Sequence, residues 1–299
     1  MMAVQLLPLR GALKFNEPMA SHTSWRIGGP AERYYEPADI DDLANFLAQQ
    51  PVEESIVWVG LGSNLLVRDG GIKGTVIMTS GLLNGLSLSD GVVRVEAGVS
   101  CAKVARFCAR HHLVGAEFLA GIPGTMGGAL AMNAGAFGGE TWNQVVSVET
   151  INYQGQRFVR QPAEFDVSYR HVKGVAHEWF VAAHLKLELG DAESASLRIR
   201  ELLDKRNASQ PIGQPSCGSV FRNPDGDYAA RLIELSGLKG QCIGGACISE
   251  KHANFIVNTG GANAADMEAL IDLIVDTVRR QHGVELCREV HIVGEAASL

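Results

Sequence analysis

This 299-residue sequence lacks an excess of positive charge, which nucleic-acid-binding proteins need, and a long apolar run, which membrane proteins need. Lysine and arginine number 26 against 33 aspartates and glutamates, so the net charge is -7. Proteins that bind nucleic acid neutralise its negative phosphates with lysine and arginine side chains. Because acidic residues are in excess here, we expect no nucleic-acid partner. The apolar stretches fall short of the roughly 18 residues that a membrane span needs, and Pro8 and Arg10 interrupt the first of them. We therefore expect no signal peptide, no membrane insertion, a cytoplasmic location and, by default, a monomer.

Cysteine is present, but without the spacing of a metal site or a disulfide framework. The six cysteines stand at positions 101, 108, 217, 242, 247 and 287, with no CxxC pair among them. Cys242, Cys247 and His252 could together ligate a metal ion, but no fourth ligand follows at a familiar spacing. We expect reduced thiols, buried or incidental, and no metal.

The common nucleotide-binding fingerprints are also missing. Gly60 and Gly62 follow a predicted strand, but Leu65 occupies the third glycine position of GxGxxG, and GxxxxGK[ST] occurs nowhere. The sequence therefore disfavours both a Rossmann dinucleotide site and a P-loop.

The sequence contains two glycine-rich segments, VGLGSNLLV at 59–67, which includes Gly60 and Gly62, and GIPGTMGGALAMNAGAFGG at 121–139. Glycine lets the main chain approach a ligand closely and adopt positive φ, so that successive N–H groups can converge on an anion such as a pyrophosphate. Tight turns are the alternative interpretation of each segment alone. Two such segments, containing Asn64 and Asn133, favour one large phosphate-bearing ligand.

The chain is long enough for two or three packed units and mixes strands with helices, without an internal repeat. β-branched and aromatic runs predict strands at 55–60, 75–79, 92–98, 145–151, 179–189, 253–258 and 287–294. Helical spacing of apolar residues predicts helices at 39–50, 100–112, 196–209, 227–237 and 263–283, with Asp39, Ser100 and Asn263 as N-caps. The change to a charged helix after Gly190 indicates a domain boundary.

Seven segments in this order resemble one family, that of UDP-N-acetylenolpyruvoylglucosamine reductase, also called UDP-N-acetylmuramate dehydrogenase. They are TSWRIGGPAERYYEP (23–37), GLGSNLLVRDGGIKG (60–74), EFLAGIPGTMGGALAMNAGAFGGE (117–140), SYR (168–170), PSCGSVFRNP (215–224), GLKGQCIGGACISEKHANFIVN (237–258) and REVHIVGE (288–295). SYR alone is a weak signal, whereas the ordered set is specific. The segment between SYR and the strand at 179–189 is short, which resembles the compact form of the family without an inserted tyrosine loop.

The resemblance implies an α+β flavoenzyme of peptidoglycan precursor synthesis. Its FAD-binding part is of the p-cresol methylhydroxylase and vanillyl-alcohol oxidase type, built of two α/β subdomains at 1–74 and 75–194, and a C-terminal α+β substrate-binding domain follows at 195–299. The implied reaction is NADPH-dependent reduction of UDP-N-acetylglucosamine enolpyruvate to UDP-N-acetylmuramate through non-covalently bound FAD.

Family motifs also imply the site residues. The FAD would contact Gly60, Leu61, Gly62, Ser63, Asn64, Leu65, Gly121, Ile122, Pro123, Gly124, Gly127, Gly128, Asn133, Gly135 and Ala136. Arg170 matches the arginine that polarises the substrate carboxylate, Glu289 the acid that cooperates with it, and Ser219 the proton donor to C2. The UDP-sugar would contact Tyr169, Asn223, Lys239 and His252, while Arg222 replaces the lysine that often precedes the asparagine.

Two alternatives to this function stay open from the sequence. The first is an FAD-dependent sugar or alcohol oxidase of the same superfamily, and the second is a non-catalytic protein that binds a UDP-sugar or a flavin. The ordered C-terminal motifs argue against the oxidase, and the set Arg170, Ser219 and Glu289 is hard to explain for a protein that only binds.

Overall fold

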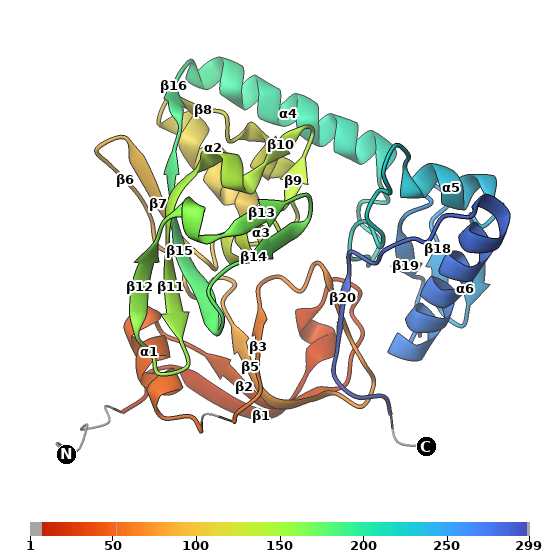
Figure 1. Ribbon diagram of the computed structural model, residues 1–299, viewed down its shortest axis with the longest axis horizontal. Helices are drawn as coiled ribbons and strands as arrows, with labels where there is room; N and C mark the ends of the chain where they lie inside the picture. Colours follow the sequence, from red (N-terminus) through yellow and green to blue (C-terminus); the bar gives the residue numbers. More distant parts are fainter. Residues whose placement is uncertain (1–7, 52, 298–299) are drawn as a thin grey trace. The chain divides into compact units, whose positions relative to one another are not determined.

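The computed structural model describes residues 8–51 and 53–297, which form two compact units (Figure 1). The first unit contains the chain up to Lys14, Tyr34–Gly60 and Gly74–Asp204. The second contains Phe15–Arg33, Leu61–Lys73 and Lys205–Leu299. The chain thus enters the second unit three times. The division into three domains at residues 75 and 195 stays a prediction.

An antiparallel five-stranded sheet forms the centre of the first unit. Its order is β12 (Arg157–Arg160), β11 (Val145–Asn152), β15 (Glu178–Lys186), β7 (Val92–Glu96) and β6 (Leu86–Ser89). The helices α2 (Cys101–Arg110) and α3 (Met126–Ala131) lie on one face of this sheet (Figure 1). Val93, Val148 and Ala183 of the sheet are buried against Val104 and Leu130 of the helices. Burial of these apolar side chains is the main stabilising contribution of this layer.

A second core of the same unit lies under α1 (Ile40–Ala48). The sheet here has the order β1 (Ala12–Pro18), β2 (Pro30–Glu36), β5 (Ile72–Met78) and β3 (Ile56–Val59), with β3 parallel to β5. Phe46 of the helix stacks on Tyr35 with ring centroids 3.8 Å apart. Asp39 caps the helix by accepting a hydrogen bond from the Asp42 N–H, as predicted.

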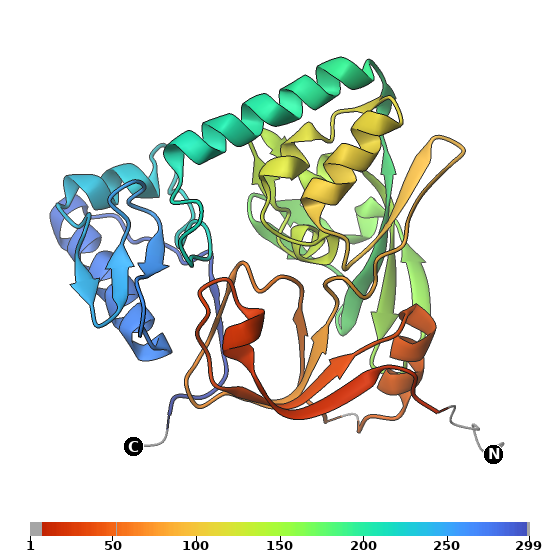
Figure 2. The same ribbon diagram turned by 180° about the vertical axis from the view of Figure 1, so that it is seen from behind.

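The second unit has a three-stranded antiparallel sheet of β17 (Cys242–Ile243), β18 (Ala246–Ile248) and β19 (Ile256–Asn258). Helices α5 (Ala229–Leu235) and α6 (Ala264–His282) pack in the same core, with α6 against the sheet (Figure 2). Strand β20 (His291–Val293) pairs in parallel with β4 (Leu65–Val67). The predicted apolar stripe of α6 is confirmed, since Met267, Ile271 and Ile274 are almost completely buried.

Short elements complete the described chain. Paired two-stranded ladders are formed by β8 (Leu113–Val114) with β16 (Glu188–Leu189), β9 (Gly135–Ala136) with β10 (Gly139–Glu140), and β13 (Asp166–Ser168) with β14 (His171–Lys173). The 3-10 helices are η1 (Met19–His22), η2 (Glu117–Gly121), η3 (Thr141–Gln144) and η4 (Pro162–Glu164). Helix α4 (Ala192–Ser209) begins four residues before its predicted start, because Asp191 accepts a 2.7 Å hydrogen bond from the Ser194 N–H and acts as its cap.

One prediction about the cysteines is wrong. Cys242 and Cys247 are directly opposite each other on β17 and β18 and form a disulfide, rather than two reduced thiols. The remaining four cysteines are free, and Cys287 is the exposed one among them. Within the described ranges, no group of three His, Cys, Asp or Glu side chains is arranged to hold a metal ion. Nor is any helix of those ranges long and apolar enough to cross a membrane.

Candidate active site

A cavity of about 270 Å³ lies in the first unit, where the glycine segments predicted to contact a cofactor meet the five-stranded sheet. Gly60 follows β3, while Gly127 and Gly128 belong to α3, and all three line the cavity. A Cβ on Gly60 would lie 2.4 Å from the Thr125 Oγ1, and one on Gly127 would lie 2.9 Å from the Ala97 Cβ. Gly128 has open space instead, with only the Thr125 Oγ1 within 4 Å of its added Cβ. These glycines therefore shape the cavity.

The cavity also has an aromatic wall, which no pattern in the sequence indicated. Trp58 and Trp179 stack with ring centroids 5.2 Å apart, and Phe165 and Phe180 lie 5.6 Å apart. These residues come from separate strands and from a loop. A narrow space between aromatic side chains and glycine main chain fits a large planar ring system.

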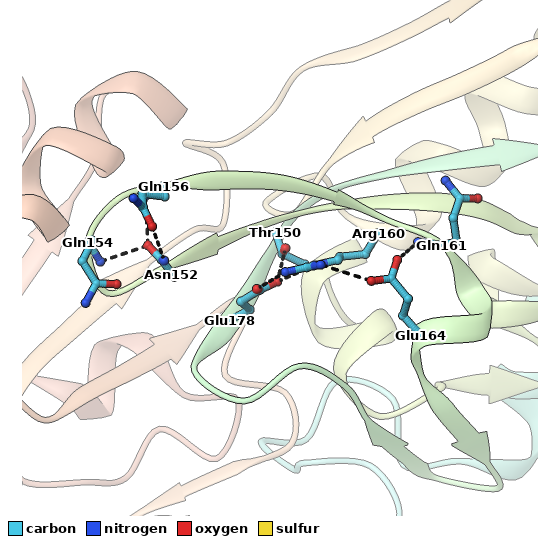
Figure 3. A network of polar contacts seen from close by, with 8 residues as sticks. All are labelled: Thr150, Asn152, Gln154, Gln156, Arg160, Gln161, Glu164 and Glu178. Carbon is cyan, nitrogen blue, oxygen red and sulfur yellow. Dashed lines mark hydrogen bonds and ion pairs between the residues drawn. The ribbon is translucent and has the colours of Figure 1, made fainter.

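Glu178 adds a negative charge to the cavity lining, and Arg160 holds it in place (Figure 3). The Arg160 Nη2 lies 2.5 Å from Glu178 Oε1 and its Nε donates to Oε2 at 3.0 Å. Thr150 Oγ1 also donates to Glu178 Oε2, at 2.5 Å. The Arg160 guanidinium, opposed by burial, holds the pKa of the Glu178 carboxyl below its usual range. The cavity therefore contains an ionised carboxylate at neutral pH.

The end of the second glycine-rich segment lies beside Arg170. Asn133, Phe137 and Arg170 are three non-glycine residues with positive φ, at 46°, 54° and 53°. The Arg170 guanidinium donates to the main-chain oxygens of Asn133 at 3.4 Å and Gly135 at 2.9 Å. Left-handed conformations outside glycine cost free energy and often occur at functional sites. The predicted carboxylate-binding arginine is thus held by the predicted cofactor segment.

Ser219 and Glu289 lie close together in the second unit. The Glu289 N–H donates to the Val220 oxygen at 2.8 Å, and Phe221 and Arg288 form an antiparallel bridge. Both Ser219 and Glu289 are half-buried. Main-chain pairing of residues 220–222 with 287–290 therefore brings the two predicted catalytic side chains into one region.

Residues 61–65 of the first glycine-rich segment also belong to the second unit. Gly62 has φ of 58°, and a Cβ there would lie 2.1 Å from the His22 oxygen, so this position requires glycine. Cys217 lies below the segment with its Sγ 3.4 Å from the Leu65 oxygen. Burial raises the pKa of Cys217 to about 12, which leaves it a neutral packing residue as the sequence predicts.

The four predicted substrate contacts have different settings. Lys239 pairs with Glu234 at 3.3 Å, and Asn223 accepts a hydrogen bond from the Ala229 N–H. His252 packs edge-on against Phe255, and burial, together with the charge of Lys239, lowers its pKa. Tyr169 is 45% exposed in the turn before Arg170. Lys239 and His252 thus lie near each other, with His252 neutral at neutral pH.

Two family models match separate parts of the chain. Residues 31–159 match the family described as FAD binding domain, and residues 210–293 match the family described as UDP-N-acetylenolpyruvoylglucosamine reductase, C-terminal domain. Together with the glycine-lined cavity, these matches define an α+β flavoprotein oxidoreductase.

The relatives are more specific. The chain is 60% identical over 298 residues to the UDP-N-acetylenolpyruvoylglucosamine reductase of Alkalilimnicola ehrlichii, covering 100% of both chains. It is 59% identical over 289 residues to that of Legionella pneumophila strain Corby, covering 96% of this chain and 94% of the relative. The crystal structure of the Thermus caldophilus reductase matches with a TM-score of 0.79 and 32% identity, over 95% of this chain and 99% of that one. The chain belongs to the UDP-N-acetylenolpyruvoylglucosamine reductase family.

Proposed function

We propose that this protein uses NADPH to reduce UDP-N-acetylglucosamine enolpyruvate to UDP-N-acetylmuramate, a step of peptidoglycan precursor synthesis. The observation that carries the proposal is the full-length likeness to reductases of this name, at 54 to 61% identity. Arg170, Ser219 and Glu289 are proposed as the catalytic set of this reaction.

The residues present fit FAD. Its ring systems require a narrow apolar space and its pyrophosphate requires main-chain donors near glycine, and the first unit has such a cavity between Trp58, Gly127 and Gly128. We assign the residues named from the sequence as its contacts, except Asn133, whose side-chain amide makes its hydrogen bonds within the protein, and we assign Gly62, Ser63 and Asn64 to the pyrophosphate. When bound, FAD supplies reversible hydride transfer between NADPH and the substrate.

Arg170 is proposed to bind and polarise the carboxylate of the enolpyruvyl group. Hydride addition at C3 leaves negative charge at C2, which spreads into that carboxylate. A guanidinium that is already oriented by the Asn133 and Gly135 oxygens loses little freedom when it meets the developing charge. Arg170 thus lowers the activation barrier of hydride transfer by stabilising the negative charge that develops on the substrate carboxylate.

Glu289 and Ser219 are proposed to complete the addition. Glu289 cooperates with Arg170 at the carboxylate, and the Ser219 hydroxyl donates the proton that C2 requires. A hydroxyl is a weak acid, but a carbanion-like C2 is a strong base, so this transfer is favourable. The left-handed Gly218, with φ of 72°, sets the direction in which the chain presents Ser219.

Lys239, Asn223, Tyr169 and His252 are proposed to bind the UDP part of the substrate. An ammonium such as that of Lys239 suits a diphosphate, which would compete with Glu234 for it. NADPH and the UDP-sugar are proposed to bind in turn, since the sequence contains no dinucleotide fingerprint that would indicate a separate NADPH site.

An anaerobic stopped-flow experiment tests the function. NADPH is added to the purified flavoprotein first, and UDP-N-acetylglucosamine enolpyruvate second. We expect the flavin absorbance to bleach on the first addition and to recover on the second. Recovery only on admission of oxygen would indicate the oxidase instead, and an unchanged spectrum on both additions would indicate a binding protein without activity.

A further inference from the structure

Asn133 is one of the few buried polar residues of the first unit, with 1% of its surface exposed. It follows α3 with φ of 46°, a conformation that asparagine tolerates better than most side chains. Buried amides are costly unless their donors and acceptors are satisfied, so the partners of Asn133 indicate why it is there.

The side-chain amide of Asn133 is used within the protein. Its Nδ2 donates to Glu140 Oε2 at 3.0 Å and to the Ser168 oxygen at 3.2 Å, and its Oδ1 accepts from the Trp142 N–H at 3.2 Å. An amide nitrogen has two hydrogens to donate, and both are engaged. The side chain of Asn133 thus connects the glycine-rich segment to the hairpin of β13 and β14.

That hairpin carries Arg170. Ser168 and His171 form the pair that closes its turn, and Tyr169 and Arg170 are the two turn residues. The same Asn133 whose Nδ2 binds the Ser168 oxygen offers its own main-chain oxygen to Arg170 Nη1 at 3.4 Å. Gly135, two residues further on, offers its oxygen to Arg170 Nη2 at 2.9 Å. Asn133 therefore contacts both the base of the turn and the guanidinium at its tip.

We propose that Asn133 is a positioning residue for Arg170. Its amide fixes the left-handed bend of the glycine-rich segment against the β13–β14 turn, so that the Asn133 and Gly135 oxygens lie where they orient the guanidinium. The proposal rests on the role of Arg170 in the proposed function. It assigns the Asn133 side chain to the placement of the arginine and not to contact with FAD.

Glu140 explains why an amide and not a carboxylate occupies position 133. An aspartate there would have the same shape, but it would place a second carboxylate at 3 Å from Glu140 and would lose both donors. A glycine would accept the positive φ without strain and would remove the whole side chain. Both substitutions therefore remove the two donated hydrogen bonds, and glycine does so without straining the backbone.

The test is a double-mutant cycle of Asn133→Gly with Arg170→Ala, measured in both halves of the reaction. Asn133→Gly should leave the FAD content and the rate of flavin reduction by NADPH unchanged. It should slow reoxidation by the enolpyruvyl substrate on the order of 10- to 100-fold, the loss that a small misplacement of a catalytic group produces. In the Arg170→Ala background the same substitution should change reoxidation less than about 2-fold, because residues that act through one another are not additive.

Asn152→Ala is the matched control, since it removes an amide that makes three hydrogen bonds in an exposed turn of the same unit. It should leave both rates at the parental values. Equal losses from Asn133→Gly in both backgrounds would overturn the proposal, and so would loss of FAD from a folded Asn133→Gly protein. A parental protein that never reoxidises with the substrate would overturn the proposed function instead.

A second pair of variants keeps the test sharp if Asn133→Gly does not fold. Asn133→Asp should be slower than the parent in reoxidation, because its carboxylate faces Glu140. Adding Glu140→Gln restores a donor and acceptor with their positions exchanged, and should recover part of the lost rate. An identical rate for Asn133→Asp with and without Glu140→Gln would contradict the proposed link.

Discussion

The side-chain amide of Asn64 donates a 3.0 Å hydrogen bond to the main-chain oxygen of Glu289, 225 residues later in the chain. The main-chain oxygen of Asn64 accepts a hydrogen bond from the His291 N–H at 3.1 Å. The glycine-rich segment predicted to contact the cofactor and the segment that carries the predicted acid Glu289 are therefore held together inside the second unit.

Asn64→Ala should lower the free energy of unfolding by about 1 kcal/mol, since it removes the hydrogen bond from the Asn64 side chain to the Glu289 oxygen. Urea denaturation of the FAD-free protein measures this change. Asn84→Ala is the control, because its amide bonds a carbonyl in an exposed turn and should cost less. Equal stability of the two variants would mean that the link to Glu289 contributes nothing.

Gly128→Ala should separate folding from cofactor binding. The added methyl group meets open space in the cavity, and alanine favours a helix over glycine by up to about 1 kcal/mol. The FAD-free variant should therefore be at least as stable as the parent, while its affinity for FAD, measured by titration with fluorescence, should fall. Unchanged affinity would show that this cavity does not hold the flavin.

Ser219→Ala should leave flavin reduction by NADPH unaffected and slow reoxidation by the enolpyruvyl substrate on the order of 10²- to 10⁴-fold, the contribution typical of a proton donor. Ser236→Ala, whose hydroxyl donates to the Leu232 oxygen at the end of α5, should change neither rate. Reoxidation of the Ser219 variant at the parental rate would remove this residue from the mechanism.

The Arg160–Glu178 pair should make stability depend on acid pH. The pKa of Glu178 is lowered in the folded protein, so its contribution to stability is complete above the unfolded value of about 4.3 and is lost as the pH falls through the folded value. Glu178→Gln should therefore be less stable than the parent at pH 7, and the difference should shrink below about pH 4. The same substitution at Glu201, in the exposed pair with Arg198, should have little effect at either pH. A pH-independent difference would mean that the charge of Glu178 is not what stabilises this wall.

The Cys242–Cys247 disulfide is testable by counting thiols. Protein isolated without reductant and denatured in iodoacetamide should take up four labels, and six after reduction, because the chain has six cysteines and four of the described ones are free. Mass spectrometry gives the count. Six labels without reduction would mean that the two thiols face each other unbonded.

Local signals in the sequence predicted five of the six α-helices in the described ranges but not α3, and they predicted the polar strands poorly. Asp39, Ser100 and Asn263 all cap their helices through the side chain, since a cap and an apolar stripe are encoded within a few residues. Strands β1 and β2 contain charged residues and proline, and their strand conformation depends on neighbours in the sheet. No interpretation of the sequence found them.

The candidate site likewise contains residues that could be predicted from the sequence and residues that could not. The glycine positions at the cavity could be found because close neighbours leave no room for a side chain, as Gly60 and Gly127 illustrate. The aromatic wall could not, because Trp58 and Trp179 are ordinary core residues until the β3 and β15 strands place their rings 5.2 Å apart. The disulfide was missed for a similar reason, since five positions of separation show no pairing until the hairpin of β17 and β18 closes.

The three entries of the chain into the second unit have a consequence for synthesis on the ribosome. Trp25 is completely buried there, and its indole N–H donates a 2.7 Å hydrogen bond to the main-chain oxygen of Ile256. Ile256 is synthesised 231 residues after Trp25. At the usual speed of translation that partner follows after roughly 10 to 50 seconds. During this interval Trp25 and the rest of Phe15–Arg33 have no completed second unit to pack into, so this part of the fold can form only after most of the chain has been synthesised.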